Sequence, residues 1–344
     1  GVIVDKRTKL SNSDKTKVPT KTITHYTQTT RRHMRRIVKD LEMNKNVLLV
    51  GERGTGKNSI IYELAHRLNQ PVELLSINEE TTVRDLTQRM VLIDGKTVWV
   101  PSNVVDAIKN NRWLILDEID RASAGVLSIL NNLLQFKQIT LPDGTTIAAG
   151  SGFKVIALMN PPTSAYAGHE LSSELEDRFL IHYIDYLPEE EEIEYLVSIA
   201  PLVDKDLITR LVRAANDLRE DYKKGHLPKP FSTRGLVNIV EHLAEYPQDS
   251  VYGELYRVFN LKYLSDEYQD TVNKVFTAYG LMRSPVSITP EEPISASDIA
   301  EETFIPKEGS FTPAERSFKT LREPINMVEE PMQYVDERTF IISE

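Results

Sequence analysis

Residues 46–68 combine an apolar run, a glycine-rich turn and an amphipathic segment, and few folds accommodate that order. The run 47–50 (VLLV) predicts a buried strand, and residues 51–57 (GERGTGK) hold three glycines. Apolar residues then recur at helical spacing from 60 to 68. A strand, a glycine turn, a lysine and a helix in this order surround an anion with backbone N–H groups and a helix N-terminus. The segment therefore predicts a phosphate-binding loop in which Lys57 reaches the terminal phosphates.

The position after Lys57 departs from the usual pattern of such loops. It commonly holds a Ser or Thr that ligates Mg²⁺, whereas this chain has Asn58. An amide oxygen also suits a hard cation, and Ser59 lies about 100° further round the helix, which makes it a poorer substitute. A glycine turn that binds nothing is the alternative interpretation. The predicted nucleotide-binding residues are Gly51, Glu52, Arg53, Gly54, Thr55, Gly56, Lys57, Asn58 and Ser59.

A second chemical signal lies further along the chain, where an apolar run ends in two carboxylates. The run 113–116 predicts a buried strand, and Asp117 and Glu118 follow it. Ligands bind at the carboxyl ends of parallel strands, so we expect Asp117 to hold Mg²⁺, directly or through water, and Glu118 to polarise an attacking water. A strand followed by two solvated acids is the alternative. We expect Asp120 and Arg121 to be structural or inter-subunit residues rather than catalytic ones.

The other apolar runs of the first half alternate between strands and helices. A strand over 154–160 ends in Asn160, for which a turn-forming Asn before proline is the alternative interpretation. Two hairpins are predicted, at 91–100 and at 138–147. A βα series of this kind predicts an α/β fold with a doubly wound parallel sheet. The remaining predicted strands cover 71–77 and 181–186, and helices fall within 29–43, 83–90, 104–110, 126–136 and 171–179.

Changes in composition divide the chain into four parts. Residues 1–25 carry six basic and two acidic residues, which predicts a flexible basic arm, with a strand added to a neighbour as the alternative. We expect residues 26–187 to form the nucleotide-binding α/β domain and residues 188–284 to form a smaller all-α lid domain. Residues 285–344 hold 13 acidic residues, 5 basic residues and seven prolines, which predicts an extended tail. The lid helices are predicted at 189–200, 206–222, 232–245, 252–262 and 266–279.

Bulk composition excludes several kinds of chemistry. The chain has no cysteine, which rules out disulfides, thiolate metal sites and cysteine nucleophiles. Since no apolar run approaches the ~18 residues of a membrane span, we expect no membrane association and a cytoplasmic location. A net charge of −10 argues against a broad nucleic-acid surface. The arginines at 31, 32, 35 and 36 predict a solvated helix face, with contact to a nucleotide, a neighbouring subunit or nucleic acid as the alternative.

Five motifs in order, GERGTGK, LILDEID, ALMNPP, LEDRF and FSTRGL, resemble those of the AAA+ ATPases. The two hairpins make the chain similar to the MoxR and dynein-related branch, which includes midasin, over about residues 26–280. The resemblance implies a P-loop NTPase core with a helical lid, ATP and Mg²⁺ as cofactors, and a ring homo-oligomer, commonly a hexamer. It also implies that the hairpins face a pore or substrate.

The resemblance assigns roles to residues of this chain. Lys57 binds the triphosphate, Asn160 resembles the sensor that orients the lytic water, and Glu118 acts on that water. Arg178 resembles the finger offered to the γ-phosphate of a neighbouring subunit, and Glu176 and Asp177 are expected to pair with it in the free state. The lid sensor is assigned to Arg234, which without the resemblance is interpreted as a surface charge.

These observations predict an ATPase that hydrolyses ATP at subunit interfaces and remodels or assembles a protein client. Two alternatives stay open. Asn58 favours a scaffold that binds nucleotide with little hydrolysis, and the basic helix and arm favour a nucleic-acid-associated motor. ATP and GTP are not distinguished by these residues.

Overall fold

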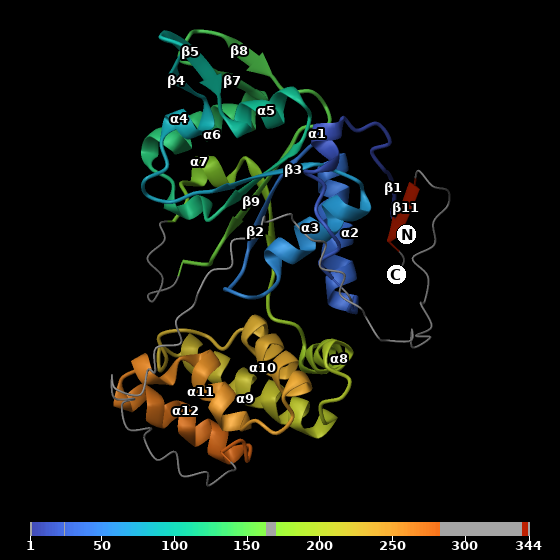
Figure 1. Cartoon of the computed structure of the whole chain (residues 1–344), viewed down its shortest axis with the longest axis vertical. Coiled ribbons are helices and arrows are strands. Elements are labelled where there is room, and N and C mark those ends of the chain that lie inside the picture. Colours follow the sequence, from blue (N-terminus) through green and yellow to red (C-terminus); the bar gives the residue numbers. More distant parts are fainter. Residues whose placement is uncertain (1, 24, 163–169, 283–338, 343–344) are drawn as a thin grey trace, which may run out of the picture. The chain divides into compact units, whose positions relative to one another are not determined.

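The computed structural model describes residues 2–23, 25–162, 170–282 and 339–342 (Figure 1). The predicted acidic tail, residues 285–344, lies outside the described residues except for positions 339–342. Within the described part of the chain, no helix combines the length and the apolar character needed to cross a membrane.

A five-stranded parallel sheet forms the centre of the α/β domain, as the βα series predicted. Its order is β10-β2-β9-β6-β3, so strands distant in sequence become neighbours. The three inner strands are almost entirely buried, because helices cover both faces, and this explains their continuous apolar runs. The strands are β2 (Asn46–Val50), β3 (Val72–Ser76), β6 (Trp113–Asp117), β9 (Lys154–Met159) and β10 (Phe179–Tyr183).

Alternate residues of the inner strands enter two separate cores. In β2, Val47 and Leu49 pack with α2 (Gln28–Glu42) and α3 (Lys57–Arg67), which cover one face. Leu48 and Val50 belong to the core on the other face. That face is covered by α4 (Val83–Leu86), α5 (Asn103–Lys109) and α6 (Ala124–Phe136).

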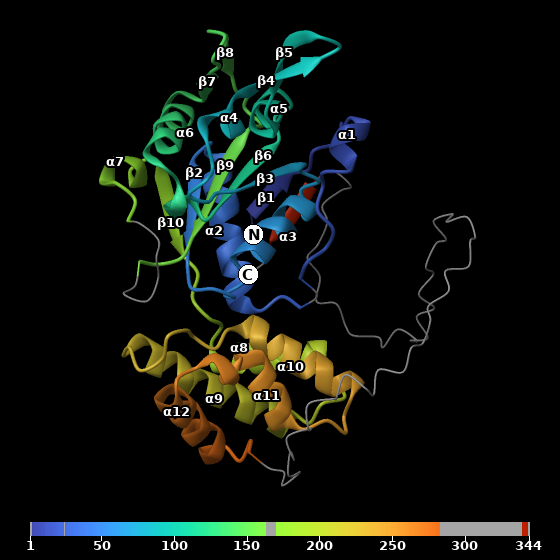
Figure 2. The same ribbon diagram turned by 60° about the vertical axis from the view of Figure 1, so that its left-hand side comes forward.

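Two hairpins lie beside each other at one end of this domain (Figures 1 and 2). The first pairs β4 (Gln88–Ile93) with β5 (Lys96–Pro101), and the second pairs β7 (Gln138–Thr140) with β8 (Thr146–Ala148). Both predicted hairpins are confirmed. The helix expected within 83–90 is only one turn long, because residues from 88 onward pair across the first hairpin.

The expectation of a flexible arm at residues 1–25 is wrong for the described residues. β1 (Val2–Asp5) pairs antiparallel with β11 (Thr339–Ile342) of the same chain. Helix α1 (Asn12–Lys15) follows, and after it the carbonyl oxygen of Lys17 accepts a hydrogen bond from the main-chain N–H of Val72 at 2.9 Å. At least one basic side chain of this segment binds to the domain, since Lys17 forms an ion pair with Glu73.

The segment also contributes a buried carboxylate to the domain. Asp14 in α1 accepts a hydrogen bond from Nε of Arg112 at 2.7 Å, and Arg112 contacts Asp106 as well. The arginine on Asp14 helps to hold its pKa below the usual range, although burial opposes this shift.

Helices alone make up the secondary structure between β10 and residue 282, as predicted. Glu192 and Arg219 form a bidentate ion pair inside this region, with N–O distances of 2.7 and 2.8 Å. The helices are α8 (Glu189–Ile199), α9 (Lys205–Lys223), α10 (Thr233–Glu245), α11 (Val251–Phe259) and α12 (Asp266–Ala278), with a short 3-10 turn η2 (Leu261–Tyr263).

Candidate nucleotide-binding site

The predicted chemical residues gather at one edge of the sheet. β2, β9 and β6 are successive neighbours and run parallel, so their carboxyl ends meet there. The glycine loop follows β2, Asn160 follows β9, and β6 ends at Asp117 with Glu118 next. The strand order therefore brings together groups that are more than a hundred residues apart in sequence.

The loop 51–56 wraps its main chain around the start of α3. Gly56 has a φ of +88°, a left-handed conformation that glycine adopts at no steric cost, and α3 begins at the next residue. At Gly51 an added Cβ would lie 2.1 Å from the main-chain oxygen of Ile184, so no other residue fits. The loop thus leads directly into the N-terminus of α3, and this arrangement is the one that binds phosphate at helix N-termini.

Lys57 is buried in this site, with 8% of its surface exposed. Its Nζ donates to the carbonyl oxygens of Gly51 (2.5 Å) and Glu52 (3.0 Å) and to Oδ1 of Asn160 (3.1 Å). Burial lowers the pKa of Lys57 to about 8, against the opposing attraction of the Asp117 carboxylate. A phosphate beside Nζ would favour the charged form again.

Asp117 and Asn58 make up the candidate metal site. The amide Nδ2 of Asn58 donates to Oδ2 of Asp117 at 2.9 Å, and the main-chain N–H of Glu118 donates to Oδ1 at 3.1 Å. The Asn58 amide oxygen and the other lone pairs of Asp117 remain as hard donors. Such a set fits Mg²⁺, which proteins hold through one or two carboxylates together with substrate phosphates.

Glu118 has an unusual backbone conformation and an ion-pair partner. Its φ of 56° and ψ of 46° are left-handed, between the end of β6 and the 3-10 turn η1 (Ile119–Arg121). For a residue other than glycine this costs roughly 1–2 kcal/mol, and such strain is concentrated at functional sites. Its Oε2 lies 3.1 Å from Nε of Arg121. The carboxylate must leave Arg121 before it can act on a water.

Arg178 lies at the edge of the sheet opposite Lys57. It directly precedes β10, whose first residue Phe179 pairs in register with Asn46 at the start of β2. The glycine loop begins only after the far end of β2. Five strand residues at about 3.3 Å each separate the two edges by roughly 17 Å. Arg178 therefore does not belong to the site formed by Lys57 of its own chain.

The side-chain partners of Arg178 differ from those predicted. Its Nε donates to Oδ1 of Asn131 at 3.2 Å, and its ion pair, at 3.7 Å, is with Glu174. The expectation that Glu176 and Asp177 pair with Arg178 is wrong for this structure. Glu174 lies in the short helix α7 (Ser173–Glu176), and Arg178 follows four residues later in the turn after the helix. Residues four apart along such a turn are neighbours, whereas residues one or two apart do not face each other.

Arg234 lies near the glycine loop. Ser232 caps α10 through the Gly235 amide, and Arg234 stands in the first turn. A Cβ added to Gly54 would lie 3.6 Å from the Cβ of Arg234, and the charge of Arg234 helps to lower the pKa of Lys57. The predicted lid residue is therefore close to the phosphate loop.

A pocket beside the loop holds residues that motif spacing did not indicate. It is lined by the loop, by Thr29 and His33 of α2, by Tyr195 of α8 and by Arg234. Burial lowers the pKa of His33. The loop and Arg234 were predicted, but Thr29, His33 and Tyr195 come from two distant helices, and their types carry no pattern. Only the fold identifies them as candidates for contact with the nucleoside part of a nucleotide.

Asp120 was expected to be a structural or inter-subunit residue, and the structure places it inside the domain. It is 2% exposed, and neither carboxylate oxygen has a hydrogen-bond partner among the residues that the structure describes. Its charge raises the pKa of Lys57. Its burial gives no support to the predicted inter-subunit role, since it offers almost no surface to a neighbour.

A parallel sheet with a glycine loop, paired acids and a polar sensor after three adjacent strands defines the P-loop class of nucleotide-binding domains. Residues 46–179 match the family described as "AAA domain (dynein-related subfamily)". These residues thus form an AAA domain of the dynein-related subfamily, as the motifs predicted. The narrower resemblance to MoxR proteins stays a prediction.

Relatives match much of this chain but differ in how much of their own length is covered. Von Willebrand factor A domain-containing protein 8 of Mus musculus is 30% identical over 288 residues, 79% of this chain and 15% of that protein. Midasin of Dictyostelium discoideum is 24% identical over 213 residues, 60% of this chain and 4% of that protein. An uncharacterized protein of Staphylococcus epidermidis is 29% identical over 214 residues, 58% of this chain and 78% of that protein.

Proposed function

We propose that this chain is a Mg²⁺-dependent ATPase whose site is completed by a second copy, and that it uses hydrolysis to remodel or assemble a protein client. The position of Arg178 is the observation that carries this proposal. The resemblance assigns this arginine to the γ-phosphate. The length of β2, roughly 17 Å, nevertheless separates it from the phosphate loop of its own chain. Head-to-tail contact between copies brings one edge to the other. Ring closure and a hexameric state are part of the proposal.

The residues of one chain supply most of the chemistry. Lys57 exchanges its three present acceptors for phosphate oxygens, and Glu118 leaves Arg121 to accept a proton from the attacking water. Asp117 and Asn58 would hold Mg²⁺, which when bound neutralises charge on the phosphates. Arg178 of a second copy then stabilises the transferring phosphoryl group, a contribution of about 10³–10⁵ in rate when a finger acts in trans.

The hairpin β4–β5 supports a protein client. Met90 and Leu92 are each more than half exposed, and Trp99 is exposed as well. Exposed apolar side chains gathered on one hairpin are typical of surfaces that bind protein. Substitution of Leu92 by Asp is expected to impair client binding while leaving basal ATP hydrolysis intact.

Mixing two inactive variants tests the shared site. Arg178→Ala keeps a complete phosphate loop, and Lys57→Ala keeps the finger. Each variant alone should lose at least about 10³-fold in turnover. A mixture should recover activity, because some interfaces then pair an intact loop with an intact arginine. Glu174→Ala, which removes a neighbour of Arg178 without removing the finger, is the matched control and should retain turnover.

Either of two results would overturn the shared site. One is full activity of Arg178→Ala alone. The other is a mixture that stays inactive although the two variants are shown by mass measurement to assemble together.

A scaffold with little hydrolysis is a second candidate, favoured by the Asn58–Asp117 hydrogen bond. This bond ties the metal ligand to an amide where related loops offer a hydroxyl. Under the scaffold hypothesis the native chain turns over slowly and Asn58→Thr accelerates it. Turnover by the native chain that Asn58→Thr leaves unchanged, and that Glu118→Gln abolishes, rejects the scaffold.

The nucleic-acid motor remains a prediction with a direct test. It requires DNA or RNA binding that weakens steeply with added salt, because arginines would replace counterions on phosphates. Lack of binding at low salt excludes it.

A further inference from the structure

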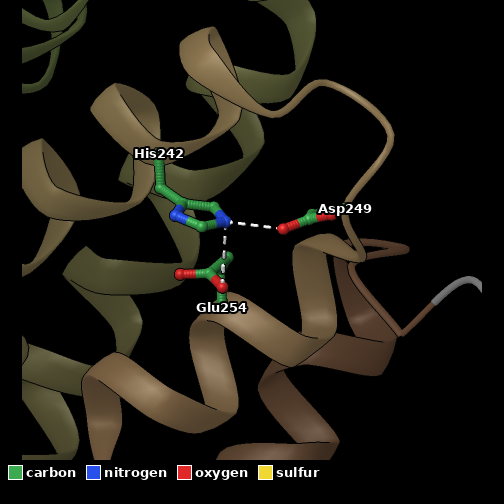
Figure 3. A group of neighbouring side chains, drawn as sticks. All are labelled: His242, Asp249 and Glu254. Carbon is green, nitrogen blue, oxygen red and sulfur yellow. Dashed lines mark hydrogen bonds and ion pairs between the residues drawn. The ribbon is translucent and has the colours of Figure 1, made fainter. Parts of the chain in front are cut away.

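We propose that the helical domain contains a binding site for a divalent transition metal, best suited to Zn²⁺, formed by His242, Asp249 and Glu254 (Figure 3). This site is independent of the nucleotide site and of the proposed ATPase activity. His242 belongs to α10, Glu254 to α11, and Asp249 to the connection between these helices.

The ligand atoms already have nearly the spacing that Zn²⁺ requires. Nε2 of His242 lies 2.8 Å from Oδ2 of Asp249 and 3.3 Å from Oε1 of Glu254, and the three ligand atoms all lie within 4.8 Å of one another. Zinc bonds of about 2.0–2.2 Å in a tetrahedron separate neighbouring ligand atoms by about 3.4 Å. The Nε2–Oε1 pair already has this spacing, and the Nε2–Oδ2 pair reaches it by opening about 0.6 Å.

The surrounding structure orients the ligands. The other oxygen of Glu254 accepts from Arg257 at 2.5 Å, so that Oε1 remains directed at the imidazole. Ser250 caps α11 through the Gly253 amide and fixes the chain directly after Asp249. Hydrogen bonds of this kind to ligating carboxylates are characteristic of metal sites.

The exposure of the site leaves room for a fourth ligand. The Glu254 side chain is 10% exposed, that of His242 is 19% exposed, and that of Asp249 is 44% exposed. Solvent therefore reaches the side of Asp249, and a water can complete the tetrahedron. One imidazole and two carboxylates favour Zn²⁺ over Mg²⁺, which prefers oxygen ligands in octahedral geometry.

Charge and tautomer also bear on the site. Arg257 donates to Nδ1 of His242 at 3.3 Å, which places the imidazole proton on Nε2, between the two carboxylates. With two carboxylates and one guanidinium, the cluster has an excess negative charge when His242 is neutral. Binding moves that proton from Nε2 to Nδ1, so Arg257 leaves Nδ1 and keeps Glu254. The ion replaces a proton between groups that are already assembled.

Calorimetric titration of the full chain with Zn²⁺, after treatment with EDTA and removal of the chelator, tests the site. We expect one saturable Zn²⁺ site that persists in excess Mg²⁺, and at least about tenfold weaker binding by His242→Ala. His226→Ala is the matched control, because in the part of the chain that the structure describes His226 contacts one carboxylate, that of Asp221, at 3.3 Å. It should bind Zn²⁺ like the native chain.

Two further measurements keep the test decisive if His242→Ala does not fold. Asp249→Asn changes an exposed side chain and should weaken Zn²⁺ binding to a similar degree without loss of helix content. Co²⁺ substituted for Zn²⁺ should give the visible absorption of a tetrahedral site, and Asp249→Asn should remove it. Zn²⁺ binding that is the same in the native chain, the control and both ligand variants would overturn the proposal, as would no saturable binding by the native chain.

Discussion

Raising the pH should weaken nucleotide binding at a point set by the buried Lys57. Burial lowers its pKa to about 8 in the nucleotide-free protein, and phosphate favours its charged form. Nucleotide binding therefore raises the pKa and takes up a proton. Below pH 8 the amine is already charged and affinity is flat. Above pH 8 the free protein loses that charge, and affinity falls by up to tenfold, or about 1.4 kcal/mol, for each unit of pH.

The structure sets the size of the effect. Between pH 7.5 and 9.5 the charged fraction of a group with a pKa of about 8 falls by about 25-fold, and the dissociation constant should rise by a similar factor. At pH 8 about half a proton should be taken up for each nucleotide bound. Isothermal calorimetry in buffers of different ionisation heat measures both quantities, with Mg²⁺ left out so that only the protein and nucleotide titrate.

Lys57→Arg supplies the control, because a guanidinium stays charged over this range. Its affinity, whatever its value, should not vary between pH 7.5 and 9.5. The reasoning is refuted if the native chain shows flat affinity up to pH 9.5 without proton uptake. That result would mean that Lys57 keeps an ordinary pKa despite its burial.

Three further predictions concern stability and chemistry. Arg112→Met removes the nearer cationic partner of the buried Asp14 carboxylate and leaves only the longer ion pair with Arg7, at 3.6 Å. It should lower the free energy of unfolding by about 3–5 kcal/mol, measured by chemical denaturation. Asp120→Asn removes a buried charge without hydrogen-bond partners among the described residues and should raise the free energy of unfolding by about 1 kcal/mol. The exposed control Asp143→Asn should change that free energy little. A destabilised Asp120→Asn protein would contradict the argument. Glu118→Gln should retain ATP and lose turnover, and rapid hydrolysis by that variant in a single-turnover assay would exclude Glu118 as the base.

The elements that the sequence located well are those whose function requires a local pattern. The glycine loop, the apolar runs ending in Asp117 and Asn160, and the Asp-Gly hairpin turn all depend on neighbouring residues, and each is found in the fold. At the turn, Asp94 and Gly95 have φ values of 51° and 73°, as a tight two-residue hairpin requires.

The features that the sequence missed depend on contacts between distant segments. The basic composition of residues 1–25 suggested a solvated arm, but it does not reveal that Asp14 meets Arg112, 98 residues later. The burial of Asp120, whose two carboxylate oxygens have no hydrogen-bond partner in the described part of the chain, likewise has no sequence signal, because an acid followed by a basic residue is ordinary on a surface. Burial, which decides the energetics of both, is a property of the whole fold.

The placement of Lys57 and Arg178 at opposite edges of the sheet determines how many complete active sites an assembly of copies contains. If the arginine acts in trans, the donor surface and the acceptor surface are different, and association is head-to-tail. An open row of copies then always has one phosphate loop without an arginine from a neighbour at one end, and one Arg178 without a neighbouring site at the other. Closing the row removes both defects at once, so specific activity should increase with the length of a row and reach its maximum only when the row has no ends.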